Sequence, residues 1–260
     1  HTGRGDTGLR LFLADLNVLA GPGGPYEHLR GMVHLDHIQH DDDSELLEWD
    51  LSGFSSIMYD ASTLPFDENI ERTARFVERR GHSILIEGAC DEIVDASGGA
   101  RNDLTTAGKA GCYLRGTGVD LIVANLGTEH RAGTRNLKYE SPAARAVRAA
   151  VGSRIVLHGA SSVSGDQIKG LYADGVCKVN IWTALERDAS PVLFESLVRH
   201  GVEAAGRETV ERLAAEGWLG GRSLSGSSVS LEHCTTTARQ AIIYRQMKEI
   251  VAGYLSLWYV

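Results

Sequence analysis

Three histidines stand where short apolar runs end, and each follows a different run. His37 closes residues 32–37, His130 comes after the run 122–126, and His158 directly follows the run 155–157. Three neutral imidazoles with an open fourth position form a catalytic Zn²⁺ site. The alternative is that each is an ordinary histidine of a core or its rim. Three such positions beside carboxylates favour the metal, so we expect one catalytic Zn²⁺ site.

Asp36 immediately precedes His37 and is the candidate base. Neighbouring side chains of a strand point to opposite faces, but a chain that turns at a strand end can bring both into one cavity. A carboxylate beside a metal-bound carbonyl compound can take a proton from the adjacent carbon, because the metal makes that carbon more acidic. The alternative is that Asp36 caps a helix expected over residues 41–49.

Two later segments have the composition of a phosphate site. Gly159-Ala160-Ser161-Ser162 and Asn180-Ile181-Trp182-Thr183 each follow an apolar run. Backbone N–H groups and hydroxyls at such positions cradle phosphate in many barrels. Either segment alone is a common turn, but the two together predict phosphate binding.

The elements that must position these residues alternate along the chain. Six short runs rich in Val and Ile predict buried parallel strands, over residues 32–35, 55–59, 83–86, 120–124, 154–157 and 176–181. Amphipathic stretches between them predict helices over 67–80, 142–151 and 166–173. Residues 9–13 are a further strand candidate, and the segment from 192 to the end is helical in pattern.

The reactive side chains decide between a closed barrel and an open sheet. They follow nearly every predicted strand, and a barrel gathers all strand ends at one mouth, whereas an open sheet spreads them along an edge. We therefore expect an α/β fold, a (β/α)8 TIM barrel. It should form a single domain over residues 1–260, with Ser223–Ser230 as a mobile linker before a C-terminal helical segment, residues 237–260.

The composition of the chain argues against some classes of binding partner. The chain has 260 residues, a net charge of −8 and 43% hydrophobic residues, which indicates a globular protein and argues against a nucleic-acid partner. Its longest uncharged apolar run, residues 250–260, is too short to span a membrane. The four cysteines are widely spaced, as free thiols in a reducing compartment would be. We expect a cytoplasmic protein without membrane contact.

These motifs, in this order, resemble the class II, metal-dependent ketose-bisphosphate aldolases, the fructose- and tagatose-bisphosphate aldolase family. The matching pieces are HLDH at 34–37, residues 53–70, the run carrying Glu87, and residues 118–130, 157–163 and 175–183. The resemblance implies a TIM barrel with a C-terminal helical arm. Only residues 1–33 precede HLDH, where the family has two further βα units, so we expect that these units are either shortened or not among the residues given.

The resemblance also implies roles. His37, His130 and His158 would hold Zn²⁺, and Asp36 would move the proton of the donor, whose enediolate Zn²⁺ would stabilise. Asp60 and Glu87 would support the metal site. The residues that would bind the donor and its phosphate are Gly159, Ser161, Asn180 and Thr183, with a monovalent cation beside the phosphate. Family members are homodimers or homotetramers, and their substrates are sugar phosphates and aldehydes.

Three departures indicate a specialised member rather than the glycolytic enzyme. Ala89 replaces the second glutamate of the family's E-x-E strand, and Arg131 replaces a glycine, where its guanidinium could fork onto a phosphate or carboxylate. In the family, the loop after the strand carrying Glu87 supplies a glutamate that protonates the aldehyde oxygen. Residues 90–106 have no clean match to that glutamate.

The expected function is that of a metal-dependent aldolase that makes or breaks a C–C bond of a ketose phosphate, with a dihydroxyacetone-phosphate-like donor. Two alternatives stay open. One is a degenerate, non-catalytic barrel that binds a sugar phosphate. The other is a Schiff-base aldolase that uses Lys178.

Overall fold

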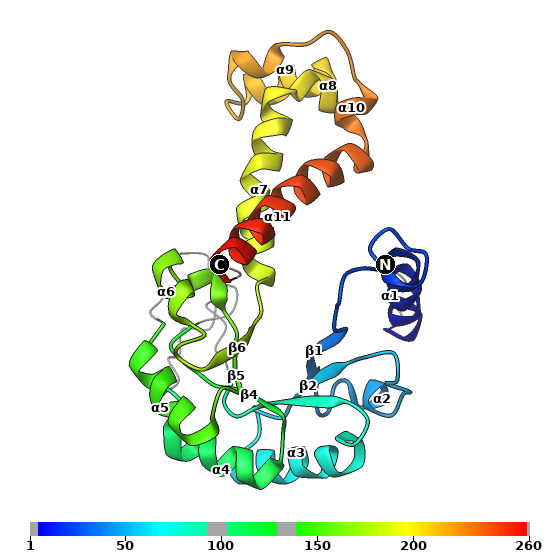
Figure 1. Ribbon diagram of the computed structural model, residues 1–260. Coiled ribbons are helices and arrows are strands. Elements are labelled where there is room, and N and C mark those ends of the chain that lie inside the picture. The colour runs from blue at the N-terminus through cyan, green and yellow to red at the C-terminus, as the bar shows by residue number, and fades with distance from the viewer. Residues whose placement is uncertain (1–4, 93–102, 129–138, 259–260) are drawn as a thin grey trace. The chain divides into compact units, whose positions relative to one another are not determined.

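Six parallel strands form one sheet in the computed structural model, which describes residues 5–92, 103–128 and 139–258. The sheet has the strand order β1-β2-β3-β4-β5-β6 (Figure 1). The strands are β1 (His34–Gln39), β2 (Ser56–Asp60), β3 (Leu85–Ala89), β4 (Leu121–Val123), β5 (Ile155–Leu157) and β6 (Val176–Val179). The predicted alternation of strands and helices is confirmed.

Helices connect the strands and, together with loops, form the chain that follows β6. They are α1 (Gly5–Ala20), α2 (Ser44–Leu47), α3 (Phe66–Arg80), α4 (Ala107–Thr117), α5 (Ser141–Val151), α6 (Gly165–Gly170), α7 (Trp182–Arg199), α8 (Gly201–Ala205), α9 (Arg207–Ala215), α10 (Leu231–Cys234) and α11 (Thr236–Trp258), with short 3₁₀ turns η1 (Ala160–Ser162) and η2 (Gly221–Leu224). No helix of the described residues is both long and apolar enough to cross a membrane.

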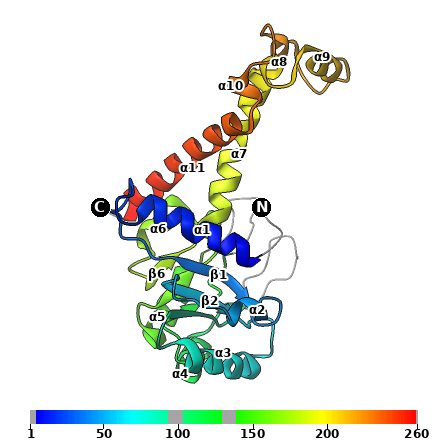
Figure 2. The same cartoon turned by 90° about the vertical axis from the view of Figure 1, so that its right-hand side faces the viewer.

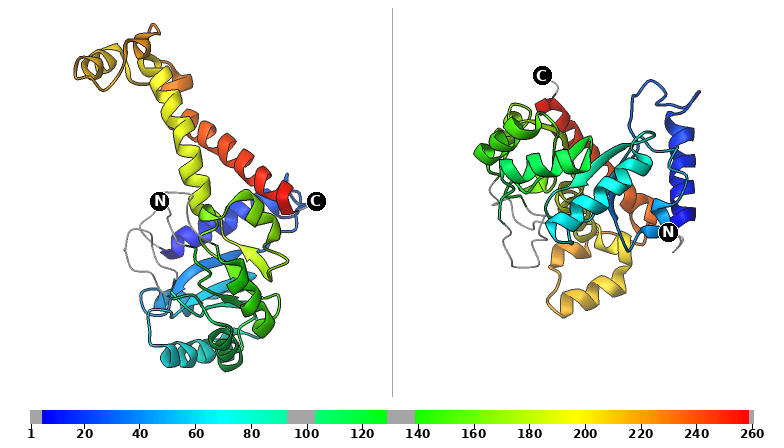
Figure 3. Two further views of the ribbon diagram at one scale, coloured as in Figure 1. Left: turned by 90° about the vertical axis from the view of Figure 1, so that its left-hand side faces the viewer. Right: turned by 90° about the horizontal axis from the view of Figure 1, so that it is seen from below.

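The chain divides into two units, which we describe separately. The first unit comprises the described residues of His1–Glu129, Lys138–His158 and Gly170–Val179 and holds all six strands. The second holds Gly159–Lys169 and the segment from Asn180 onward. In this second unit α7 and α11 run side by side (Figure 3). The single domain over 1–260 and the mobility of Ser223–Ser230 stay predictions.

The outer face of the sheet is covered by α3, α4 and α5 (Figure 1). The ring of Phe76 from α3 stacks on Tyr59 of β2, with 4.5 Å between centroids. Tyr113 from α4 lies so close to Gly88 of β3 that a methyl group there would meet its hydroxyl at 2.8 Å. Glycine at this strand position therefore lets the helix layer approach the sheet.

The inner face carries both the core and the polar residues. Met58, Ala89, Val123 and Val156 form a buried apolar cluster across four neighbouring strands. Glu87 shares the face of Ala89, because side chains two residues apart on a strand point the same way. Within the described residues the sheet is a parallel half-barrel, which confirms the TIM-barrel-like α/β class. The shortened N-terminal units stay a prediction.

The strand predicted over Leu9–Leu13 is wrong, because these residues lie in α1. Leu9, Leu13 and Leu16 are half-buried along one side of that helix. Their spacing of i, i+4 and i+7 fits a helix rather than a strand. The helix runs beside the beginning of β1 (Figure 2).

A buried hydrogen-bond network connects α3 and α4 to β3. Asn69 of α3 donates from Nδ2 to the carbonyl of Ala89 at 2.9 Å, and its Oδ1 accepts from Thr73 at 3.1 Å and from Tyr113 at 3.3 Å. Asn69→Ala should lower the free energy of unfolding by about 2–3 kcal/mol, because it leaves buried polar groups unpaired. Urea denaturation measures this loss.

The matched control is Glu71→Ala on the exposed side of the same helix. Its ion pair with Arg75 is surface-exposed, so the change should stay within about 0.5 kcal/mol. Equal losses for the two variants would contradict a stabilising role for the Asn69 network.

Candidate metal centre

A bulge in β1 brings Asp36 and His37 to one site. Leu35 pairs with Ile57 and Ile38 with Tyr59, so two residues of β1 stand against Met58 alone. His37 has a φ of 51°, the one positive value among the described residues other than glycine. A bulge re-aims side chains that a regular strand would send to opposite faces. The expectation that a strand end achieves this is wrong, because β1 continues to Gln39.

Two histidine nitrogens converge on one point. His37 Nε2 lies 3.1 Å from His158 Nδ1, and the rings meet edge to face at 81°. Two nitrogens bound to one tetrahedral Zn²⁺ at about 2.0–2.1 Å would lie about 3.3 Å apart. An oxygen of Asp36 joins them, since the ligand atoms of all three residues lie within 4.8 Å of one another.

The outer nitrogen of each ring contacts a carboxylate. His37 Nδ1 lies 3.3 Å from Asp60 Oδ2, and His158 Nε2 lies 3.1 Å from Glu87 Oε1. Histidines that bind metals almost always donate their second ring N–H to such an acceptor, which fixes the ring and leaves the other nitrogen's lone pair free. The donor set therefore fits a divalent cation.

Both supporting carboxylates are held ionised. Burial alone would raise the pKa of Asp60, but hydrogen bonds from His37 and Ser62 lower it to about 2. Gln39 Nε2 adds a hydrogen bond to Asp60 at 3.0 Å. Burial likewise raises the pKa of Glu87, whose side chain is 0% exposed, yet His158 and Lys178 bring that pKa below its usual value.

Asp36 and His37 also have shifted acidities. Partial burial raises the pKa of Asp36, but His34 and the charges of His158, His37 and Lys178 lower it well below its usual range. Burial lowers the pKa of His37, and Asp60 and the other carboxylates nearby raise it above its usual value. The Asp36 side chain is 46% exposed, so a carboxylate at the centre is open to a ligand.

His34 and Gln39 are polar members of this centre to which the sequence interpretation gave no role. His34 Nδ1 lies 2.8 Å from Ser56 Oγ, and its Nε2 lies 3.1 Å from Lys178 Nζ. One signal could have found His34, because it shares the HLDH motif and stands two residues before Asp36. The contact of Gln39 with Asp60 depends on the bulge and has no local signal.

The other expected site residues fall into two groups. His130 and Arg131 lie outside the described residues, so the third imidazole and the guanidinium are not placed. Gly159, Ser161, Asn180 and Thr183 belong to the second unit, and the described residues of the metal centre belong to the first.

Within the second unit, the turn η1 has the features of a ligand-binding loop. Gly159 precedes it with a φ of 69°, which glycine adopts without strain. Ser161 Oγ is buried and has no hydrogen-bond partner among the described residues, although the carbonyl of Ser161 accepts from Arg187 Nη1 at 3.2 Å. A buried hydroxyl left unpaired is costly, so this atom suits a bound polar group.

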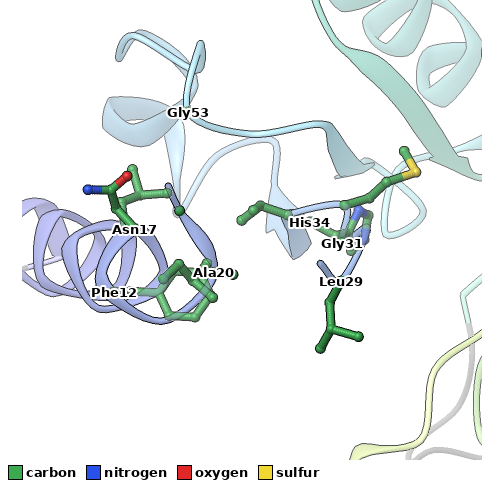
Figure 4. A pocket seen from close by; sticks show the side chains of 12 residues that line it. Phe12, Asn17, Ala20, Leu29, Gly31, His34 and Gly53 are labelled. Carbon is green, nitrogen blue, oxygen red and sulfur yellow. The ribbon is translucent and has the colours of Figure 1, made fainter. Parts of the chain in front are cut away.

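A pocket of about 540 Å³ between α1 and the start of β1 is a different feature (Figure 4). It is lined mainly by apolar side chains such as Phe12, Leu16 and Val33, and His34 is the one residue of the metal centre that reaches it. It lacks the converging polar groups that a site for a sugar phosphate needs.

Solved structures of aldolases share this fold. The YdjI aldolase of Escherichia coli K12 aligns with a TM-score of 0.59 and 20% identity, over 95% of this chain and 75% of that one. The fructose-bisphosphate aldolase of Campylobacter jejuni aligns with a TM-score of 0.57 and 18% identity, over 87% of this chain and 69% of that one. At these identities the likeness establishes the fold.

Sequence comparison identifies the family of the chain. The family model described as fructose-bisphosphate aldolase class-II matches residues 22–219, well over half of the chain. The matched range contains β1 through β6 and every residue of the metal centre. The chain therefore belongs to the class II fructose-bisphosphate aldolase family.

Proposed function

We propose that this protein is a metal-dependent aldolase that makes or breaks a C–C bond of a ketose phosphate. The observation that carries the proposal is the pair of histidine nitrogens 3.1 Å apart, each ring backed by a buried carboxylate and both beside Asp36. The departures at Ala89 and Arg131 favour a specialised member over the glycolytic enzyme.

The proposed metal is one Zn²⁺ ion, held by His37, His158 and, from its motif, His130. When bound, it would supply a Lewis acid that polarises the donor's carbonyl group and acidifies the neighbouring carbon. Asp60 and Glu87 orient the two described imidazoles through the outer ring nitrogens. These contacts would leave His37 Nε2 and His158 Nδ1 as the ligand atoms for the metal.

Asp36 is the proposed base. In the direction of bond formation its carboxylate takes a proton from the hydroxymethylene carbon of a dihydroxyacetone-phosphate-like donor. The electron pair left on that carbon forms the new bond to the carbonyl carbon of an aldehyde, whose oxygen then gains a proton. Nearby imidazoles and Lys178 lower the pKa of Asp36 and keep its carboxylate ionised. Because this also makes the carboxylate a weaker base, the proposed proton transfer needs the acidifying effect of the metal on the donor's carbon.

The donor's phosphate is proposed to bind Gly159, Ser161 and Thr183, with Asn180 near the reacting carbons and a monovalent cation beside the phosphate. The buried, unpartnered Oγ of Ser161 supports this, because a phosphate oxygen would satisfy it. Arg131 is proposed to contact a phosphate or carboxylate of a substrate. We further propose a cytoplasmic homodimer or homotetramer that binds neither nucleic acid nor membranes.

Contacts of Lys178 disfavour the Schiff-base alternative. Its Nζ lies 2.8 Å from Glu87 Oε2, and an ammonium paired with a buried carboxylate is not a nucleophile. Retention of Asp36, His37 and His158 in one cluster disfavours the degenerate, non-catalytic barrel.

Metal removal should abolish turnover. The full chain, stripped with a chelator, should lose at least about 100-fold in aldol activity on a panel of ketose phosphates, because the carbonyl is no longer polarised. Added Zn²⁺ should restore activity, and elemental analysis should give one Zn²⁺ per chain. Full activity in a sample shown to be metal-free would refute the mechanism.

Asp36→Ala should separate proton transfer from metal binding. We expect Zn²⁺ to remain bound while exchange of the donor's hydroxymethylene proton with deuterated solvent, followed by NMR, falls about 100-fold or more. Asp42→Ala, at an exposed position after β1, is the control and should exchange normally. Unchanged exchange in Asp36→Ala rejects the base, and loss of Zn²⁺ would make Asp36 a metal ligand instead.

Borohydride treatment should leave the protein unmodified. When the enzyme turns over a ketose phosphate in the presence of borohydride, mass spectrometry should detect no adduct, because no imine forms. A donor adduct on Lys178 would favour the Schiff-base mechanism.

A further inference from the structure

Lys178 connects strands that are not neighbours in the sheet. It lies on β6, where it pairs with Val156 of β5, and its side chain is 26% exposed. Its ammonium lies 2.8 Å from Glu87 Oε2 on β3 and 3.1 Å from His34 Nε2 on β1. Since β1 and β6 are the first and last strands of the sheet order, a single ammonium joins the two edges to the middle.

Glu87 divides its two oxygens between different partners. Oε1 lies 3.1 Å from His158 Nε2, and Oε2 accepts from Lys178. A fully buried carboxylate is stable only when it is paired and hydrogen-bonded. Without Lys178, Oε2 would lose its hydrogen-bond donor and be left with His34 Nε2 at 3.7 Å, and the carboxylate could turn away from His158. The orientation of the His158 ring therefore depends on Lys178 through Glu87.

His34 makes the second contact of the ammonium. An ammonium has donors only, so Nε2 of His34 accepts from Lys178, and Nδ1 carries the hydrogen that points to Ser56 Oγ at 2.8 Å. His34 opens β1 two residues before Asp36, at the start of the bulged segment. The same ammonium thus holds the strand that carries Asp36 and His37.

We propose that Lys178 is a positioning residue for the metal centre, which ties Glu87 to His34 and thereby holds His158 Nδ1 toward the metal. This inference adds a residue role to the proposed function. It depends on one part of that proposal, the binding of a divalent cation at His37 and His158. It differs from a Schiff-base role, because Lys178 forms no bond to substrate.

The affinity of the full chain for Zn²⁺ tests this role without a measurement of catalytic activity. It is measured by competition with a chromophoric chelator. Lys178→Met keeps the length of the side chain but removes its charge and donors, and should weaken Zn²⁺ binding by about tenfold to hundredfold, as loss of a hydrogen-bonding partner behind a metal ligand does. Lys178→Arg should recover at least part of this loss. The control Lys169→Met, at an exposed position of α6, should bind as the unchanged protein does.

A double-mutant cycle shows whether Lys178 acts through Glu87. If it does, adding Lys178→Met to Glu87→Gln should weaken Zn²⁺ binding by less than about threefold, because the shared interaction is already lost. Additive losses, or unchanged affinity in Lys178→Met, would overturn the proposal. Circular dichroism establishes that each variant is folded, and Lys178→Gln replaces Lys178→Met if the latter is not.

The outcomes separate this inference from the proposed function. A protein that binds Zn²⁺ but turns over no ketose phosphate refutes the aldolase proposal, while the affinity comparison still decides the role of Lys178. A protein that turns over substrate with Zn²⁺ affinity unaffected by Lys178→Met refutes only the positioning role. Absence of Zn²⁺ binding in the unchanged chain overturns both.

Discussion

A carboxylate without solvent contact, that of Glu87, lies on the inner face of the half-barrel and must be neutralised by its neighbours. Lys178 supplies the opposing charge and His158 a hydrogen bond, and through them Glu87 connects β3 to β6 and to the end of β5. The described centre has three carboxylates, from Asp36, Asp60 and Glu87, against one ammonium, so a divalent cation held by neutral imidazoles would balance it.

The curved sheet was predictable because its signals are local. Buried parallel strands are short apolar runs, and Ser56–Asp60 and Ile155–Leu157 lie within one residue of the runs expected for them. Helix α3 follows from a periodic apolar pattern and begins one residue earlier than predicted. The helix α1 was missed because its leucines, read over five residues, resemble a strand, and only the longer window to Leu16 separates the two periods.

The candidate site was predictable in its residue types but less so in its geometry. Asp36, His37 and His158 do come together although β1 and β5 are not neighbours, since the carboxyl ends of the strands of a barrel-like sheet converge. The means by which Asp36 and His37 share a face is a bulge, which is a property of the pairing of β1 with β2 and has no local sequence signal. The partners of Lys178 were also out of reach, because 91 residues separate it from Glu87.

The departure at Ala89 gains a physical meaning from these contacts. Ala89 packs in the apolar inner cluster with Val123 and Val156, two residues beyond Glu87 on the same face. A second carboxylate there would add a buried negative charge to a centre that already has more carboxylates than ammonium groups, and burying a charge without a partner is costly. A methyl group at this position removes that demand and adds to the apolar cluster. The loss of this glutamate is thus compatible with one divalent cation at His37 and His158, held in a centre whose remaining charges are matched.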